Sequence, residues 1–267
     1  MSTASTSISP TPTVFGGVVR YDVRERVAEV TLDRPDVSNA IDVETARALH
    51  QAIERAATDS AANVVLLQGA GRLFCAGGDL AAMGAAPDRP AFVSSLANAA
   101  HEAVKALDAL TKPVVVAVQG AAAGIGLSLV LGADLVVAGA SARFVTAYTS
   151  VGLTPDGGLS WLLPRTVGQR RAIELILTSE PLDAARAQTL GIVSEICEDA
   201  EVATAARAAA ARLAARPAHA LGAARGLVRA SWARTLEEHL DKESETIARA
   251  SGEQETAALI ASFLDRG

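Results

Sequence analysis

The chain has few aromatic residues and very few cysteines. Only 3% of its 267 residues are aromatic, and its two cysteines are Cys75 and Cys197. Two thiols are too few for the disulfide framework of a small secreted domain or for a cysteine-rich metal site. We therefore expect a core of aliphatic side chains and a reducing, cytoplasmic location.

The chain also lacks an excess of basic residues and long apolar runs. Twenty-four Lys and Arg stand against thirty Asp and Glu, a formal net charge of −6. This balance weighs against nucleic acid or an anionic membrane surface as the main partner. We expect no membrane span, because no run reaches about 18 apolar residues. We expect no metal site either, because no His/Asp/Glu cluster has ligand spacing.

The first fourteen residues are rich in Ser, Thr and Pro and have neither the basic segment nor the apolar run of a secretory signal. We predict a flexible tail over residues 1–14. Beyond it, strand and helix patterns alternate up to residue 196, which is typical of an α/β fold with a buried sheet. Residues 200–264 have helical patterns only, interrupted near Pro217 and Gly252. We predict an α/β core over residues 15–199 and a helical oligomerisation region over residues 200–267.

Two glycine-bearing segments follow predicted buried strands. The first runs from Gly71 to Leu80 and contains Gly77-Gly78; adjacent glycines let a ligand approach the main chain. The second runs from Gln119 to Ser128 and opens a predicted helix, whose first N–H groups are free to bind an oxyanion. Leu129 stands where a dinucleotide fingerprint needs its third glycine, which disfavours a Rossmann domain.

These two segments resemble the paired oxyanion loops of the crotonase (enoyl-CoA hydratase/isomerase) superfamily. Four sets of residues carry the resemblance, in the family's order and spacing: Leu32-Asp33-Arg34-Pro35 to Asn39-Ala40, Phe74 to Leu80, Lys112-Pro113-Val114 with Gln119-Gly120, and Gly152 to Gly158. The resemblance implies an α/β spiral of β-β-α units with a helical C-terminal region. It also implies a homotrimer or a dimer of trimers.

The resemblance further implies which residues form the site. The N–H groups of Gly78 and Ile125 are expected to form an oxyanion hole for a thioester carbonyl. Coenzyme A is expected as part of the substrate, with no permanently bound cofactor. The residues expected to bind the substrate and its coenzyme A arm are Asn39, Ala40, Ala76, Asp79, Leu80, Ala81, Met83, Ser128 and Tyr148.

The catalytic side chains depart from the hydratase pattern of this superfamily. Ser128 and Tyr148 occupy the positions of the two hydratase glutamates, while Asp156 stands where isomerase-type members place an aspartate. A single carboxylate suits a proton shuttle, because no water has to be positioned. We therefore predict an enoyl-CoA isomerase of fatty acid metabolism that acts through Asp156. Hydration by a lyase reaction, thioester hydrolysis, dehalogenation and acyl-CoA binding without turnover remain alternatives.

Several of these residues have a second interpretation. Asp156, followed by two glycines and an apolar run, has the pattern of a helix N-cap. Ser128 lies in half of a nucleophile elbow that lacks its second glycine, and it can equally be a small residue facing the acyl pocket. Tyr148 can pack or donate a hydrogen bond to substrate. The four histidines, His101 among them, lie on predicted helices and are expected to have surface or packing roles.

Overall fold

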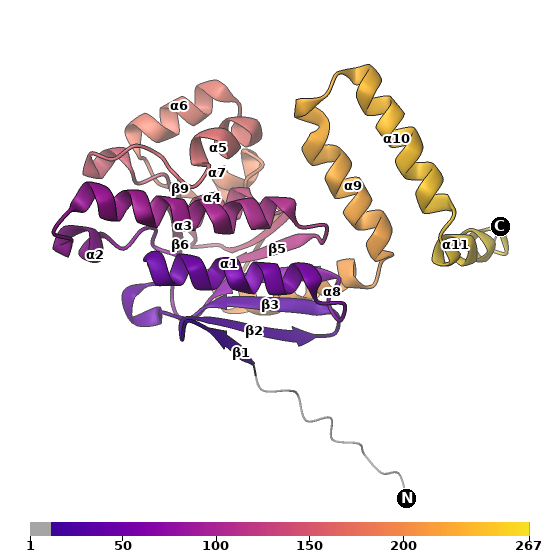
Figure 1. Ribbon diagram of the computed structural model, residues 1–267, viewed down its shortest axis with the longest axis horizontal. Helices are drawn as coiled ribbons and strands as arrows, with labels where there is room; N and C mark the ends of the chain where they lie inside the picture. Colours follow the sequence, from indigo (N-terminus) through magenta and orange to yellow (C-terminus); the bar gives the residue numbers. More distant parts are fainter. Residues whose placement is uncertain (1–11, 267) are drawn as a thin grey trace, which may run out of the picture.

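The computed structural model describes residues 12–266. Within them the chain forms two β-sheets and a series of helices (Figure 1). The strands are β1 (Thr13–Phe15), β2 (Val19–Arg24), β3 (Val27–Leu32), β4 (Val64–Gly69), β5 (Val114–Val118), β6 (Ala121–Ala123), β7 (Leu135–Gly139), β8 (Arg143–Val145), β9 (Leu182–Asp183) and β10 (Glu195–Cys197).

The helices alternate with the strands up to β10 and then follow one another to the end of the described chain. The α-helices are α1 (Val43–Thr58), α2 (Leu80–Ala85), α3 (Arg89–Ala109), α4 (Ile125–Leu131), α5 (Leu159–Val167), α6 (Gln169–Thr178), α7 (Ala184–Thr189), α8 (Val202–Ala214), α9 (Ala218–Ala230), α10 (Leu236–Ser251) and α11 (Gln254–Leu264). The short 3₁₀ helices are η1 (Pro35–Val37), η2 (Thr149–Val151), η3 (Asp199–Glu201) and η4 (Ser231–Ala233).

The larger sheet has seven strands in the order β1-β2-β3-β4-β5-β7-β10. The first three strands are antiparallel neighbours, and the pairs from β3 to β10 are parallel. Its strands β3 and β5 are buried along their whole length, as expected for strands that are covered on both faces. Strands β6, β8 and β9 form a second, three-stranded sheet. The α/β prediction is confirmed.

Side chains alternate between the two faces of the large sheet, and each face has its own helices. On one face Val65 and Leu67 belong to the main apolar cluster, together with Leu49 of α1 and Leu96 of α3. On the other face alternate residues of the same strands pack against α8. These residues are Val64, Leu66, Val115, Ala117 and Val137 from the sheet, and Val202, Ala206, Ala209, Ala210 and Ala214 from α8. The sheet is therefore sandwiched between α1 with α3 and α8.

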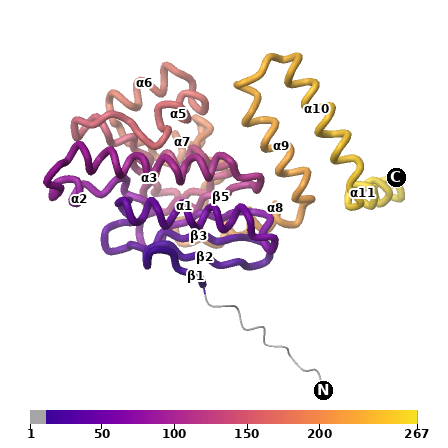
Figure 2. The backbone as a smooth tube through the Cα atoms, in the orientation of Figure 1, coloured from indigo at the N-terminus to yellow at the C-terminus, as the bar shows by residue number. Residues whose placement is uncertain are grey.

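Helices α9, α10 and α11 form a C-terminal arm, residues 218–264, that extends away from this layered body (Figures 1 and 2). Arg225 of α9 ties the arm to the body, because its Nε lies 2.7 Å from Asp134 Oδ2 and its Nη2 donates to the carbonyl of Leu107 at 3.1 Å. Just after α9, the ring of Trp232 lies 5.9 Å from the guanidinium of Arg165, which also stacks on Trp161 of the same helix α5 at 3.8 Å from the ring centroid. The contacts of Arg225 and Trp232 join the arm to the body.

Two predicted boundaries are wrong. Thr13 and Val14, predicted to belong to a flexible tail, form an edge strand with β2; residues 1–11 of that tail lie outside the described part. The core also extends beyond residue 199, because the alanine-rich α8 packs on the sheet. The helical region that stands apart from the core begins after Pro217 and not at residue 200. Its predicted breaks are confirmed, since α8 ends before Pro217 and α10 before Gly252.

Among residues 12–266, no helix combines the length and the apolar character that crossing a bilayer requires.

Candidate active site

A cavity of about 270 Å³ lies where the two glycine-bearing segments meet the middle of α3. Its walls come from five separate stretches of the chain. The lining residues are Ile41, Ala76, Gly77, Gly78, Leu80, Met83, Val93, Ser94, Leu96, Ala97, Ala100, Gly124, Ile125, Thr146, Ala147, Tyr148, Val151, Leu153, Thr154 and Asp156. All but a few of these side chains are apolar, and Asp156 is the single carboxylate in this set.

The main chain at Gly78 presents a free N–H to the cavity. The segment around it pairs with Ile41: the Ile41 N–H donates to the Gly77 carbonyl at 2.8 Å, and the Asp79 N–H donates to the Ile41 carbonyl at 2.9 Å. In this parallel bridge the neighbours of Gly78 make the hydrogen bonds. The Gly78 N–H therefore has no backbone acceptor recorded among the described residues.

The second free donor is the N–H of Ile125, the first residue of α4. The first N–H groups of a helix have no intrahelical acceptor, and they carry the positive end of the helix dipole. Gly124 precedes it with φ 51°, a left-handed conformation that glycine tolerates. Both free donors line the same cavity.

The two donor segments are hydrogen-bonded to each other. Cys75 forms an isolated bridge with Ala122: its N–H donates to the Ala121 carbonyl at 3.1 Å, and its carbonyl accepts from the Ala123 N–H at 3.0 Å. Gly126 fits against this bridge, because a Cβ at residue 126 would lie 2.8 Å from the Cβ of Cys75. The relative position of the two donors is therefore fixed by main-chain contacts.

Asp156 is hydrogen-bonded to Tyr148. The phenol Oη of Tyr148 donates to Asp156 Oδ1 over 2.5 Å, a length typical of a charge-assisted bond between a hydroxyl and a carboxylate. Burial raises the pKa of Tyr148, and the adjacent charge of Asp156 raises it further, so the phenol stays protonated. The N-cap interpretation of Asp156 is wrong, because Gly158 caps α5 without any side-chain hydrogen bond.

The residue after Asp156 is held by a histidine that the sequence patterns did not single out. The Gly157 N–H donates to Nε2 of His101 at 3.2 Å, so this nitrogen carries no proton and the ring is the Nδ1–H tautomer. Gly157 has φ 58°, and a Cβ there would collide with Cδ1 of Ile125. His101 lies four residues after the cavity-lining Ala97 on α3. At this spacing the two residues share a face of the helix, but no signal in the sequence showed that this face meets the site.

Seven of the twelve predicted site residues line the cavity: Ala76, Gly78, Leu80, Met83, Ile125, Tyr148 and Asp156. The other five, Asn39, Ala40, Asp79, Ala81 and Ser128, do not belong to that lining. Asp79 caps α2 through the Ala82 N–H at 3.0 Å and lies 3.5 Å from the Arg34 guanidinium. Its side chain therefore has a structural role.

Asn39 has a structural role as well. Its side chain is fully buried, accepts from the Arg34 N–H at 2.9 Å and donates to the carbonyls of Ala70 and Leu73, both at 2.8 Å. Through these hydrogen bonds the Asn39 amide joins the loop after β3 to the loop after β4. Contact between a coenzyme A arm and the Asn39 side chain would require this loop to rearrange, so the predicted role of Asn39 is not supported.

Ser128 is fully buried, and no hydrogen-bond partner of its Oγ is found within residues 12–266. The nearby Tyr148 phenol is close enough for the hydroxyl to moderate the rise in the Tyr148 pKa, but the pair does not meet hydrogen-bond geometry. A nucleophilic serine needs a base within hydrogen-bond reach, and Ser128 has none in the described structure. The nucleophile interpretation is therefore not supported.

We predict that Ser128→Ala raises the free energy of unfolding by about 1 kcal/mol, because it removes a buried hydroxyl that has no partner. For a chain of this size the melting temperature should rise by roughly 2–4 °C. Thr146→Val is the matched control, since the Thr146 hydroxyl donates to the Leu175 carbonyl at 3.0 Å and its loss should destabilise the chain. Calorimetry measures both; a lower melting temperature for Ser128→Ala would show that the hydroxyl is satisfied.

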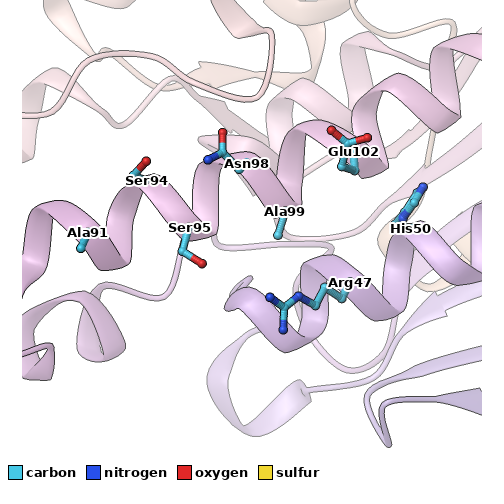
Figure 3. A pocket seen from close by; sticks show the side chains of 8 residues that line it. All are labelled: Arg47, His50, Ala91, Ser94, Ser95, Asn98, Ala99 and Glu102. Atoms are coloured by element: carbon cyan, nitrogen blue, oxygen red, sulfur yellow. The ribbon is translucent and has the colours of Figure 1, made fainter.

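A second, more open groove of about 610 Å³ lies between α1 and α3 (Figure 3). It is lined by Arg47, His50, Ala91, Ser94, Ser95, Asn98, Ala99 and Glu102, and Ser94 lines the first cavity as well. Helix α3 is thus the wall between the two spaces. The free main-chain donors and Asp156 belong to the first cavity, which we take as the candidate active site. The described residues contain no group of three or more His, Cys, Asp or Glu side chains arranged to hold a metal ion.

Comparison with known proteins agrees with this geometry. The family model described as enoyl-CoA hydratase/isomerase matches residues 22–267. The 1,2-epoxyphenylacetyl-CoA isomerase of Escherichia coli (strain K12) is 37% identical over 83% of this chain and 85% of its own length. The trans-2-decenoyl-[acyl-carrier-protein] isomerase of Streptococcus mutans is 38% identical over 67% of this chain and 69% of its own length.

Solved structures agree as well. The crystal structure of an enoyl-CoA hydratase from Polaromonas sp. JS666 superposes with a TM-score of 0.89 at 32% identity, over 94% of this chain and 98% of the other. Similar proteins thus carry both isomerase and hydratase names.

Proposed function

The chain belongs to the enoyl-CoA hydratase/isomerase family, and from this premise we propose that it shifts a double bond within an enoyl-CoA thioester. One observation carries the choice of isomerisation: a single carboxylate, Asp156, shares the cavity with the two free N–H groups of Gly78 and Ile125. Such a set supplies one base and an oxyanion hole. It does not supply a pair of carboxylates for activating water.

The proposed reaction starts from a 3-enoyl thioester. Asp156 takes a proton from the α-carbon, and the electrons of the broken C–H bond move into a dienolate whose oxygen carries the negative charge. The N–H groups of Gly78 and Ile125 donate to that oxygen. Asp156 then returns the proton to the γ-carbon, giving the 2-enoyl thioester without oxidation or reduction.

These parts are sufficient for a large rate enhancement. A positioned general base contributes about 10²–10⁴-fold, and removal of one oxyanion donor typically costs about 3–4 kcal/mol. The main-chain bridge between the two donor segments keeps the donors in place before the charge develops, which is the condition for such a contribution.

The mostly apolar lining of the cavity favours substrates whose acyl chain is aliphatic and uncharged. Its walls are formed by Leu96, Ala97 and Ala100 of α3 with Ile41 and Leu153, and none of its lining residues is a cation. Leu80 and Val151 also line the cavity and are each about half exposed (54% and 51%), so they form an apolar entrance for the acyl chain. A second carboxylate on the acyl group would find no counter-charge here.

Coenzyme A enters this proposal as part of the substrate, with no permanently bound cofactor. We propose that its arm approaches along the segment from Asp79 to Met83, because Met83 covers Gly78: a Cβ at residue 78 would lie 2.7 Å from Cε of Met83. The unbranched Met83 side chain can move aside when a thioester enters. We also propose that the enzyme is cytoplasmic and that it assembles as a homotrimer or a dimer of trimers.

We predict that 3-enoyl-CoA substrates incubated in D₂O are isomerised, while crotonyl-CoA is hydrated very slowly. Neither Ser128 nor Tyr148 offers a carboxylate to water, and Asp156 Oδ1 is already bonded to the phenol. Mass spectrometry separates the outcomes, since isomerisation, proton exchange, hydration and hydrolysis give different masses or retention times. Fast hydration of crotonyl-CoA without isomerisation of 3-enoyl-CoA would contradict the proposal and favour a hydratase.

A further inference from the structure

We infer that Tyr148 is a positioning residue, which keeps Oδ1 of Asp156 occupied so that Oδ2 alone takes and returns the substrate proton. This inference rests on the proposed isomerase function and adds a residue to it. It starts from the 2.5 Å hydrogen bond between Tyr148 Oη and Asp156 Oδ1, both in residues that line the cavity.

The direction of this hydrogen bond is fixed. A carboxylate can only accept, so the phenol is the donor. Burial and the charge of Asp156 both raise the pKa of Tyr148, and the phenol therefore keeps its proton at any pH at which an enzyme is assayed. Tyr148 is not a second acid for the substrate; it is a permanent hydrogen-bond donor to one oxygen of the base.

The backbone around Tyr148 is built to hold the ring in this place. Ala147, which precedes it, has φ 63°, a left-handed conformation that costs free energy for a residue other than glycine. The Tyr148 carbonyl accepts from the N–H groups of both Val151 and Leu153, at 3.1 and 3.0 Å. The next side chain, Thr149, donates to the carbonyl of Ile176 at 2.8 Å. The backbone at Tyr148 is therefore held in place by the hydrogen bonds of residues 148 and 149, and this fixes where the phenol ring starts.

Asp156 is restrained from the backbone side as well. The next residue, Gly157, donates its N–H to His101 of α3. The phenol thus holds one oxygen of the carboxylate, and the hydrogen bond from Gly157 to His101 holds the main chain next to Asp156. The hydrogen bond at Oδ1 opposes the rotation that would exchange the two oxygens, and in this proposal the oxygen that accepts the proton therefore also returns it.

This restraint has a measurable consequence for the fate of the proton. A proton on Oδ2 faces the dienolate and returns to it, whereas a carboxyl group free to rotate brings the proton to other positions, where water can exchange it. The parent enzyme should therefore carry a substrate deuteron from the α-carbon to the γ-carbon with substantial retention. Loss of the phenol should increase its exchange with solvent.

The experiment compares the parent with Tyr148→Phe on 3-enoyl-CoA deuterated at the α-carbon, in H₂O. We expect the share of deuterium found at the γ-carbon to fall at least about threefold in the variant. kcat should fall about tenfold, as for loss of one hydrogen bond to a charged group, with KM nearly unchanged. A merely structural role for Tyr148 would lower activity without changing the deuterium share.

A second measurement does not depend on activity. The chain has two tyrosines, Tyr21 and Tyr148, so Cζ-labelled tyrosine gives two carbon resonances, and Tyr148→Phe identifies one of them. Asp156→Asn should shift the Tyr148 resonance and leave that of Tyr21, which donates to Asp59 at 2.9 Å, in place. An unmoved Tyr148 resonance would overturn the inference.

The outcomes separate the inference from the function on which it rests. Isomerisation by the parent with an unchanged deuterium share in Tyr148→Phe refutes the role of Tyr148 and leaves the proposed function standing. If the parent isomerises no enoyl-CoA, the proposed function is wrong and the inference falls with it.

Discussion

Asp156→Asn is expected to lower the rate of enoyl-CoA isomerisation at least about 10²-fold, the effect of losing a general base. An amide cannot take the α-proton, but it keeps the shape of the carboxylate and can still accept from the Tyr148 phenol. The two oxyanion donors are main-chain groups that the substitution does not touch. Thioester binding, measured by calorimetry with a non-reactive acyl-CoA, should therefore be nearly unchanged.

The stability of the Asp156→Asn variant should also change little, because Asp156 does not cap α5. Asp183→Asn is the matched control: Asp183 caps α7 by accepting from the Arg186 N–H at 2.8 Å, and asparagine caps about as well as aspartate. That variant should keep the parent rate. If Asp156→Asn isomerises as fast as the parent, the base lies elsewhere and the proposed mechanism is wrong.

Charged substitutions in the C-terminal arm are expected to abolish the proposed assembly. Phe263 and Leu264 of α11 are exposed to 74% and 70% in the single chain, and Leu236 of α10 to 75%. A single chain seldom exposes so many large apolar side chains together unless another surface covers them. The proposed trimer, in which neighbouring copies cover the arm, accounts for this exposure.

The test is light scattering on the intact chain and on the double variant Phe263→Glu with Leu264→Glu. The intact chain should have three or six times the chain mass of 27.3 kDa, and the double variant should fall towards one chain mass. Val14→Glu, at a half-exposed position of the edge strand β1, is the control and should keep the assembly. A monomeric parent chain at micromolar concentration would contradict the proposed assembly.

A truncation that removes only the arm has to begin after Ala215, because α8 belongs to the core. The alanine-rich sequence of α8 is equally compatible with a helix exposed to solvent and with a helix packed on a flat surface. Only the sheet decides between them, since the small side chains of Ala206, Ala209 and Ala210 let the helix lie close to β4 and β5. Composition alone does not reveal which surface a helix meets.

The fold and the main chain of the site could be predicted from local patterns. Val64 to Leu67 of β4 and the whole of β5 are continuous apolar runs, with Gly69 at the end of β4 and Pro113 before β5, and a donor loop follows each strand. The short edge strand β1 was missed, because three residues, Thr13 to Phe15, between Pro12 and Gly16 are too short a pattern to be distinguished from the preceding tail. Its pairing with β2 depends on a partner and not on its own sequence.

The side-chain contacts around Asp156 could be predicted only in part. Tyr148 lies eight residues before Asp156, and their hydrogen bond depends on how the chain folds back between the two residues. His101 comes from a helix 56 residues away, and nothing in its own neighbourhood marks it as a partner of Gly157. For Asn39 the sequence motif suggested a contact with the ligand. In the structure its side-chain amide instead forms hydrogen bonds that join two loops.

The hydrogen bonds that join the two oxyanion donor segments involve main-chain groups only. The oxyanion donors at Gly78 and Ile125 are fixed by the main-chain bridge between Cys75 and Ala122, and neither Asp156 nor Tyr148 takes part in that bridge. Carbonyl activation and proton handling are therefore separable parts. A redesign can exchange the group at residue 156 for another acid, a nucleophile or an inert side chain and keep the thioester-activating frame intact. This makes the scaffold a natural starting point for new thioester chemistry by single substitutions.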